Sequence, residues 1–345
     1  MAVRNANVPS FMDVMTRMDP GGGLSDIAEI LTETNEANDD MSWVEGNLVT
    51  GDRHTVRTAK PTVDFRRLNQ GTARSKSGTA QIEEQAAILV GKHQIDRDLA
   101  ILSGNIGKYR MDEGVSFLEA MSDKLWETVF YGNAISDDKS FHGLANRFGS
   151  LSGSYGSQIV DAGGTGTDNR SIWLVNWAPN KVSGIYPKGS KGGLMHMDVT
   201  ANKSVGPDGY PIGDELLDAD GNPYLGYKDH WQWNCGLKVK DPRYVVRCAN
   251  IDFSLLTAGI TTGADLALQM VKMLGRIQGL NGGNAAFYMS RDLENMLDQQ
   301  ETVASRAFHG FNRANFGRPG QDSLAFRGVP IRRMDVLNVD EARVV

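Results

Sequence analysis

The segment GIYPKGSKGG, residues 184–193, is the part of the chain most similar to a phosphate-binding loop. A loop of the form G-x-x-x-x-G-K-[ST] places a lysine directly after its second glycine and a hydroxyl directly after the lysine. Here Ser190 stands before Lys191, so that order is reversed, and no helix is predicted to follow. The segment is therefore interpreted as a glycine-rich turn that carries Lys188 and Lys191 to the surface.

Three other patterns that could bind a metal or perform catalysis are incomplete. The segment DADGN at 218–222 has its glycine two positions too early for a calcium loop, which predicts a β-turn. The six histidines never form an HxH or HxxxH spacing, which disfavours a local zinc site. The segment GSLSG at 149–153 has Leu151 where a nucleophilic serine would stand. We expect no cofactor and no metal, and catalysis would require residues that only the fold brings together.

The two cysteines, Cys235 and Cys248, are too few for a disulfide framework. Strand-like segments at 227–239 and 244–251 flank a turn-like Asp241-Pro242 and predict a hairpin in which the two thiols face each other. Proline cannot adopt the positive φ that short hairpin loops favour, so a slipped register would separate the thiols. We expect two free, buried thiols, as is usual in a reducing compartment.

Six arginines and one acid, Asp322, occupy the stretch from 306 to 333. They could face nucleic acid, but phenylalanines are interleaved with them, and arginine and aromatic residues are enriched at protein interfaces. A junction between protein subunits is favoured, with Arg313 and Arg318 as contact candidates.

The composition limits the classes of protein to which the chain can belong. A length of 345 residues suggests about two domains, and the hydrophobic and charged fractions of 40% and 23% are usual for a soluble protein. The formal charge of −6 argues against a basic nucleic-acid binder. No run approaches about 18 apolar residues, so no membrane-spanning helix is expected. The first residues also lack the apolar core of a signal peptide.

An acidic segment leads directly into a basic one near the start of the chain. Residues 29–45 contain six acids and no lysine or arginine, whereas residues 53–76 contain seven lysines or arginines and one acid, Asp64. We predict a short helix over Ser25–Thr34 and mostly extended chain from residue 46 to about residue 96. The strand-like runs VDFRRL and AAILVG are separated by the polar TARSKSG. Taken alone, each charged run is most simply a solvated face.

The strongest helix prediction covers Asp112–Gly132. Leu118, Met121, Leu125 and Val129 recur at helical spacing, and neighbouring aromatic residues widen them into a broad apolar stripe. Acids at 112 and 113 would lie in the first turn, where the helix dipole favours them. At 1.5 Å per residue the helix would be roughly 30 Å long.

Beyond residue 150 the sequence predicts short strands and turns, followed by alternating strands and helices. TTGADLALQMVKMLGRI predicts a helix that is apolar nearly all round and therefore buried, with Thr262 and Asp265 at capping-box spacing. AAFYMS predicts a strand and RDLENMLDQQ a helix capped by Ser290. FRGVPIRRMDVL predicts a closing strand.

Two of these segments carry a resemblance to a known family. Residues 129–148 read VFYGNAISDDKSFHGLANRF, and residues 171–194 read SIWLVNWAPNKVSGIYPKGSKGGL. Together they resemble the major capsid proteins of tailed double-stranded-DNA bacteriophages, whose α+β subunits have the Hong Kong 97-type fold. In that family an amphipathic helix runs into a FYGN-like turn, and a strand pair closes on an IYPKGSK-like loop. Neither segment holds a nucleophile–base pair, so the resemblance implies that the chain is not an enzyme.

The resemblance implies a domain organisation. It divides the chain into an N-terminal arm at 1–45, an extended β-hairpin loop with flanking strands at 46–96, a peripheral domain with the long spine helix at 97–148, an axial domain at 149–318 with a β-hairpin insertion at about 196–250, and a C-terminal strand at 319–345 returning to the peripheral domain.

The resemblance also implies partners. Copies of the chain would form pentamers and hexamers of an icosahedral head around double-stranded DNA, which they would touch only weakly and without sequence preference. Arg66 and Arg67, on the extended loop, would join Lys188, Lys191, Arg313 and Arg318 as inter-subunit contact candidates. A separate scaffolding protein, a portal and a decoration or cement protein are further expected partners, with no membrane involved. The protein would reside in the virion capsid after assembly in the host cytoplasm.

Two alternatives remain open at this point. An encapsulin-like nanocompartment shell protein would share the fold but enclose enzyme cargo. A hydrolase with an α/β core would be a protein of a different class, with a catalytic site assembled in space.

Overall fold

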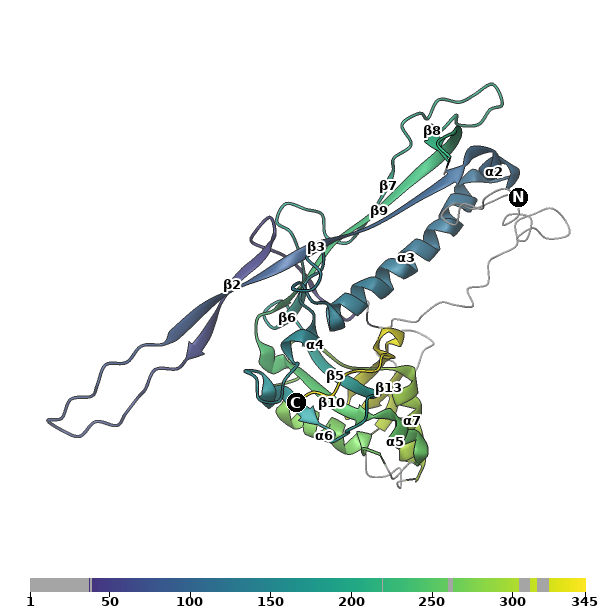
Figure 1. Ribbon diagram of the computed structural model, residues 1–345. Helices are drawn as coiled ribbons and strands as arrows, with labels where there is room; N and C mark the ends of the chain where they lie inside the picture. Colours follow the sequence, from purple (N-terminus) through teal and green to yellow (C-terminus); the bar gives the residue numbers. More distant parts are fainter. Residues whose placement is uncertain (1–36, 38, 219, 260–262, 304–310, 315–322) are drawn as a thin grey trace. The chain divides into compact units, whose positions relative to one another are not determined.

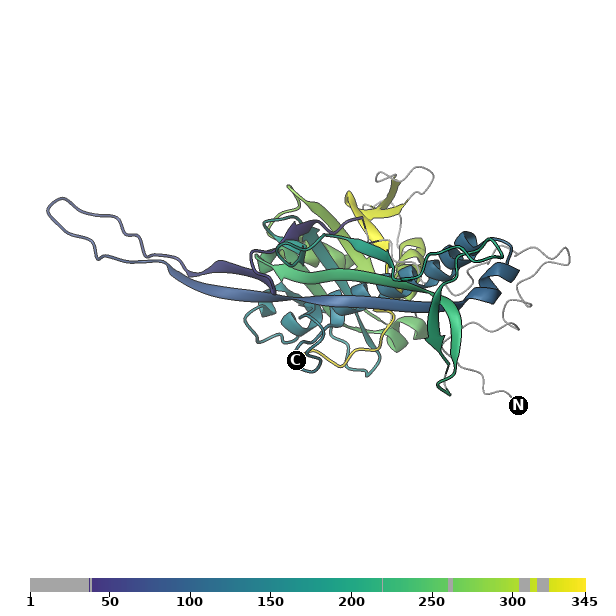
Figure 2. The ribbon, with the colours of Figure 1, turned by 90° about the horizontal axis from the view of Figure 1, so that it is seen from above.

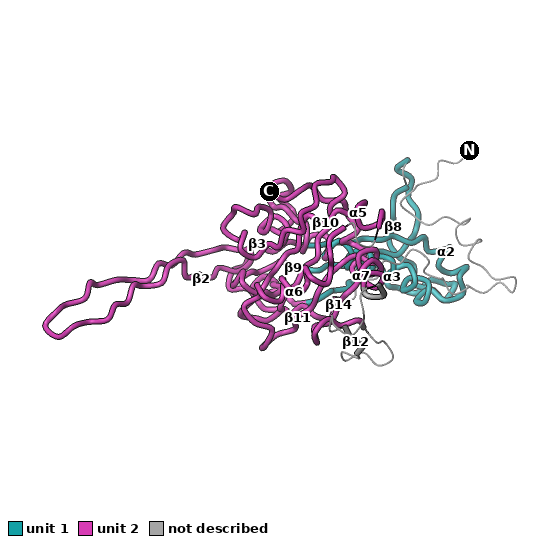
Figure 3. The backbone as a smooth tube through the Cα atoms, turned by 90° about the horizontal axis from the view of Figure 1, so that it is seen from below, with its two compact units in different colours: residues 1–33, 88–125, 193–234 teal, residues 34–87, 126–192, 235–345 magenta. Residues whose placement is uncertain are grey.

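The computed structural model describes residues 37, 39–218, 220–259, 263–303, 311–314 and 323–345 (Figure 1). These residues belong to two compact units that are interleaved in sequence (Figure 3). Unit 1 comprises residues 1–33, 88–125 and 193–234, and unit 2 comprises residues 34–87, 126–192 and 235–345. The helix predicted at 25–34 lies outside the described residues. The domain bounds predicted from the sequence stay a prediction.

The sheet of unit 2 is built around β5 (Asn169–Trp177), in which every residue is buried. β5 runs antiparallel to β10 (Val245–Asp252) on one side and to β11 (Asn284–Met289) on the other. A strand with neighbours on both sides and layers on both faces has no solvated side, which explains its continuous run of buried residues. Beyond β11 follow β14 (Val329–Arg333) in parallel, then β13 (Ser323–Phe326) and β12 (Phe311–Ala314), while β4 (Ile159–Asp161) pairs with β10.

One face of this sheet is apolar and covered by helices. The strand registers place Val246, Leu174, Phe287 and Ile331 in one row across four strands, and all four are buried in the same core. That core also contains residues of α5 (Phe253–Ala258), α6 (Leu266–Arg276) and α7 (Arg291–Val303), the helices that lie against the sheet in Figure 1.

The caps of α6 and α7 can be compared with the sequence prediction. The Ser290 hydroxyl accepts the N–H of Leu293 at 3.4 Å, as expected for the N-cap of α7. Asp265 itself caps α6 by accepting the N–H of Leu268 at 2.9 Å, so the helix begins after that residue. The prediction that α6 is buried all round is wrong, because Leu268 is 49% exposed and only one face meets the core.

The opposite face of the unit 2 sheet carries a mixed row. Arg247, Trp173, Tyr288 and Arg332 are register partners across four neighbouring strands, and all four are buried. The last turns of α3 (Ile106–Tyr131) cover the middle of this row, where Trp126 and Phe130 pack against the two aromatic rings. This row therefore has aromatic residues at its centre and an arginine at each end.

Helix α3 begins six residues earlier than the sequence predicts. The side chain of Asn105 accepts the N–H of Lys108 at 3.0 Å and so caps the start of the helix. The predicted stripe is confirmed at Met121, Leu125 and Val129, which are 5%, 3% and 1% exposed. Asp112 and Glu113 lie beyond the first turn and do not act on the helix dipole as proposed.

The strands of unit 1 come from β3 (Gly78–Asp96), β7 (Leu194–Asp198), β8 (Asp214–Leu217) and β9 (Pro223–Val239). β9 pairs antiparallel with β7 and β8, and the short helix α2 (Arg97–Leu102) follows β3 with Asp96 as its N-cap. A small core of unit 1 contains Ile95, Leu99 and Tyr109. The turn predicted at 218–222 is present, with Gly221 at φ 84°.

The predicted hairpin between 227–239 and 244–251 is wrong. Both strands exist, but the end of β9 pairs with β6 (Val182–Tyr186), whereas β10 pairs with β5 and β4. A 3-10 turn at Pro242–Tyr244 separates them. Local sequence gave no indication of these distant partners, because strand pairing depends on what lies across the sheet.

Two further predictions need correction. The closing strand is a hairpin, because Arg327 and Gly328 adopt positive φ of 49° and 83° between β13 and β14. The run VDFRRL at 63–68 contains no strand and belongs to the loop between β2 (Gly51–Ala59) and β3. The remaining elements are β1 (Trp43–Glu45), which pairs with β6, helix α4 (Leu144–Arg147), and 3-10 turns at Gly156–Gln158 and Asp335–Leu337. No helix among the described residues is long and apolar enough to cross a membrane.

Candidate assembly interface

The loop at 60–77 is the most exposed part of unit 2. It closes the hairpin of β2 and β3 (Figure 1 and Figure 2) and projects away from the rest of unit 2 in Figure 3. Every residue from 57 to 77 is exposed, including Arg66 and Arg67. Its limbs are joined by the Ser75 hydroxyl, which donates to the carbonyl of Thr62 at 2.7 Å.

This loop exposes large apolar side chains as well as charge. Val63, Phe65 and Leu68 are 87%, 107% and 92% exposed. Single exposed apolar residues are common on soluble proteins, but three within six residues beside two arginines form a patch of the kind found at protein interfaces. The subunit itself supplies no cover for this patch among the residues that the structure describes.

The loop at 187–193 is the glycine-rich turn that the sequence predicts. The Ser190 hydroxyl donates to the carbonyl of Pro187 at 2.7 Å, and Gly189 has φ 79°. The N–H of Gly189 donates to the Glu45 carboxylate at 2.9 Å, so this amide already has a hydrogen-bond partner within the subunit. Lys188 and Lys191 are both exposed, as expected for surface contacts.

The other two contact candidates are only partly described. Arg313 lies on β12, opposite Leu324 of β13, and its side chain is outside the described part of the structure. Arg318 lies outside the described residues.

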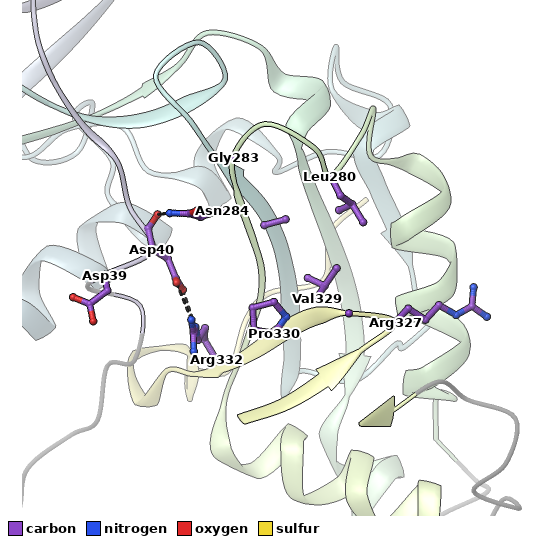
Figure 4. Close-up of a pocket in the computed structure, with 11 residues that line it drawn as sticks. Asp39, Asp40, Leu280, Gly283, Asn284, Arg327, Val329, Pro330 and Arg332 are labelled. Atoms are coloured by element: carbon purple, nitrogen blue, oxygen red, sulfur yellow. Dashed lines mark hydrogen bonds and ion pairs between the residues drawn. The ribbon is translucent and has the colours of Figure 1, made fainter. Parts of the chain in front are cut away.

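The anchor of residues 39–46 was not predicted from the sequence. The Asp40 carboxylate accepts two hydrogen bonds from Arg332, each at 2.9 Å, and a third from the Tyr288 hydroxyl at 3.1 Å. Figure 4 shows Asp40 and Arg332 pointing toward one another beside a cavity of about 530 Å³. Burial and the nearby Asp40 charge raise the pKa of Tyr288, so its hydroxyl stays a donor. The partners are 292 residues apart, and no local pattern could have predicted the pair.

A matching anchor holds residues 335–345 at the other end of the buried row. Arg247 donates to the Glu341 carboxylate at 2.6 Å, to the Ser171 hydroxyl at 3.0 Å and to the carbonyl of Phe148 at 2.8 Å. The Tyr131 hydroxyl donates to the other oxygen of Glu341 at 2.7 Å. The two arginines that end the mixed row thus each bind one carboxylate from a segment far from them in the sequence.

Unit 1 has a polar clamp of its own around Asp229. Arg110 donates to both oxygens of this carboxylate at 3.0 and 2.7 Å, and His196 lies 2.9 Å away. Burial alone would raise the pKa of Asp229, but the hydrogen bonds from Arg110 and His196 outweigh it and the pKa is lowered. His93, at 3.2 Å, is a third neighbour. The clamp ties α3 to β3, β7 and β9.

The sites described above offer little support for metal binding or thiol chemistry. The described residues contain no group of three or more His, Cys, Asp or Glu side chains placed to hold a metal. Cys235 and Cys248 are free and buried, as predicted, and burial raises the pKa of each thiol to about 12. Such thiols are poor nucleophiles near neutral pH.

Residues 19–345 match the family described as major capsid protein GP7. A match over nearly the whole chain shows that the chain belongs to this family of major capsid proteins. It is a structural component of a bacteriophage virion, with the Hong Kong 97-type fold that the two sequence segments indicated.

A solved structure agrees with this assignment. A chain in a structure of bacteriophage Epsilon15 is 27% identical, with a TM-score of 0.73 over 100% of both chains. A chain of the bacteriophage JBD30 capsid is 11% identical over 91% of this chain and 96% of that one, with a TM-score of 0.46. An encapsulin from Synechococcus elongatus PCC 7942 is 11% identical over 67% of this chain and 92% of that one, with a TM-score of 0.42. No protein with a curated description matches the chain.

Proposed function

We propose that this major capsid protein forms the pentamers and hexamers of an icosahedral head, and that the loop at 60–77 clasps a neighbouring subunit. The observation that carries the proposal is the exposed patch of Val63, Phe65 and Leu68 beside Arg66 and Arg67. Burying three such side chains would contribute roughly 1.5–3 kcal/mol each. Arg66 and Arg67 would add charge-assisted bonds and fix the register of the contact.

The support for the other four contact candidates is less direct. Lys188 and Lys191 are exposed on a turn in which the Ser190 hydroxyl bonds to the Pro187 carbonyl and the N–H of Gly189 bonds to the Glu45 carboxylate. Arg313 and Arg318 are proposed as contacts from the sequence alone. The proposal includes a domain organisation with an N-terminal arm, an extended loop, a peripheral domain and an axial domain.

Other partners follow from the role of a head protein. A separate scaffolding protein would guide assembly in the host cytoplasm, a portal would occupy one vertex, and a decoration or cement protein could bind outside. The charge of −6 fits an inner wall that touches packaged double-stranded DNA only weakly and without sequence preference. No catalytic activity is part of this function.

The loop contact can be tested by two pairs of variants. Phe65→Ser and the double variant Arg66→Glu/Arg67→Glu should each leave a folded subunit and prevent closed shells. Phe65→Leu and Arg66→Lys/Arg67→Lys are the matched controls, which keep the apolar area and the charge. Exposed charge pairs contribute only about 0–1 kcal/mol each, but the contact recurs around every ring.

The measurements are negative-stain microscopy for shells and circular dichroism for the fold. Shells of normal yield from both Phe65→Ser and the charge-reversed variant would remove the loop from the interface. Double-stranded DNA inside particles from infected cells would further separate a phage head from an encapsulin-like compartment.

A further inference from the structure

A buried ionic cluster, which we call the root cluster, stabilises the base of the hairpin that carries the loop at 60–77. Asp52 on β2 lies directly opposite Glu84 on β3, and both are only 4% exposed. Lys238 on β9 reaches Asp52 at 2.5 Å, and Arg147 on α4 donates to both oxygens of Glu84 at 2.6 Å each. Two carboxylates and two cations balance, so the root is held from two other elements without net charge.

His54 also lies in this root cluster, but it has no hydrogen-bond partner there. It lies two residues beyond Asp52 on the same face of β2 and is 7% exposed. Its Nδ1 is 3.7 Å from the nearer oxygen of Asp52, too far for a hydrogen bond, and neither ring nitrogen has a hydrogen-bond partner among the described residues. A buried imidazole without partners is an exception that calls for an explanation.

We propose that the root cluster stabilises the base of the β2–β3 hairpin at neutral pH. Protonation of His54 in acid would weaken this stabilisation. Protonation would add a fifth, unbalanced charge to a buried cluster that is neutral as it stands. The new imidazolium would also compete with Lys238 for the carboxylate of Asp52. Either effect weakens the hold of β9 on the hairpin.

The direction of the pH effect follows from the burial of His54. Burial lowers the pKa of His54 below its ordinary value of 6.5, with Lys238 and Lys240 adding to the shift and Glu84 and Asp52 opposing it. The folded hairpin root therefore binds fewer protons than the opened one. Its stability is complete above pH 6.5 and falls as the pH drops from there toward the folded pKa.

Local hydrogen exchange of the full-length soluble chain tests this proposal. Amides in 51–59 and 78–87 should lose protection between about pH 7.5 and about pH 5, after correction for the intrinsic exchange rate, by at most about tenfold per pH unit for one proton. His54→Gln should abolish the pH dependence, and the half-buried His230→Gln on β9 should leave it unchanged. His54→Phe serves if the glutamine variant does not fold.

Local measurement is essential because a second buried histidine, His93, also has its pKa lowered by burial and lies in unit 1. Global unfolding would mix the two sites. Unchanged protection of the root in the wild type, or an equal loss in the His54 variants, would overturn the proposal. Only its consequence for assembly rests on the proposed function, because exchange is read on unassembled subunits whether or not the loop contacts a neighbour.

Discussion

At the residue scale, the buried charges of unit 2 act as attachment points. Arg247 and Arg332 are 4% and 5% exposed at the two ends of one row across the sheet, and each binds a carboxylate from a different distant segment. A buried pair is weak evidence for added stability, but removing one partner leaves an uncompensated charge. These arginines therefore specify where residues 39–46 and 335–345 lie.

The Glu341→Ala variant should be destabilised by about 3–5 kcal/mol, because Arg247 would stay buried without its carboxylate. Asp340→Ala is the control, since the adjacent Asp340 side chain is 65% exposed. Equilibrium denaturant unfolding of soluble subunits gives both values. Equal stability of the two variants would show that the Glu341 pair contributes nothing, and the double variant Arg247→Met/Glu341→Leu should recover part of the loss.

At the element scale, the sequence predicted what periodicity and capping can determine. The stripe of α3 was predicted because Met121, Leu125 and Val129 repeat at helical spacing, and the cap of α7 because Ser290 precedes a helical run. The start of α3 was missed because Asn105 caps it ahead of a stretch without a clear apolar period. The pairing of β9 and β10 was wrong because their true partners, β6 and β5, lie more than fifty residues earlier.

Met121→Asp tests the orientation of α3. A carboxylate at a site that is 5% exposed has no partner designed for it, so the subunit should lose several kcal/mol of stability and accumulate in the insoluble fraction. Ala120→Asp, at the exposed position before it, should change stability by less than about 1 kcal/mol. Soluble, shell-forming Met121→Asp protein would mean that this face of the helix is not core.

At the scale of the whole molecule, the candidate site could be located from the sequence but not explained by it. The charge runs identified the loop at 60–77 and its arginines, yet a basic run is usually a solvated face. Only the structure shows that Val63, Phe65 and Leu68 are exposed together on a hairpin. The anchors of Asp40 and Glu341 could not be predicted, because their partners Arg332 and Arg247 are 292 and 94 residues away in the sequence.

Deleting the loop tests whether it contributes to the stability of the subunit or only to assembly. Replacing residues 61–76 by Asn-Gly, which favours a tight hairpin turn, removes residues that are all exposed, so the free energy of unfolding should change by less than about 1 kcal/mol. The shorter chain should remain a soluble subunit under conditions in which the full chain forms shells, because it lacks the patch that a neighbour would cover. Sedimentation velocity and thermal unfolding measure the two properties on the same sample. Shells of normal size from the shortened chain would show that the loop is dispensable, while a large loss of stability would show that it supports its own subunit.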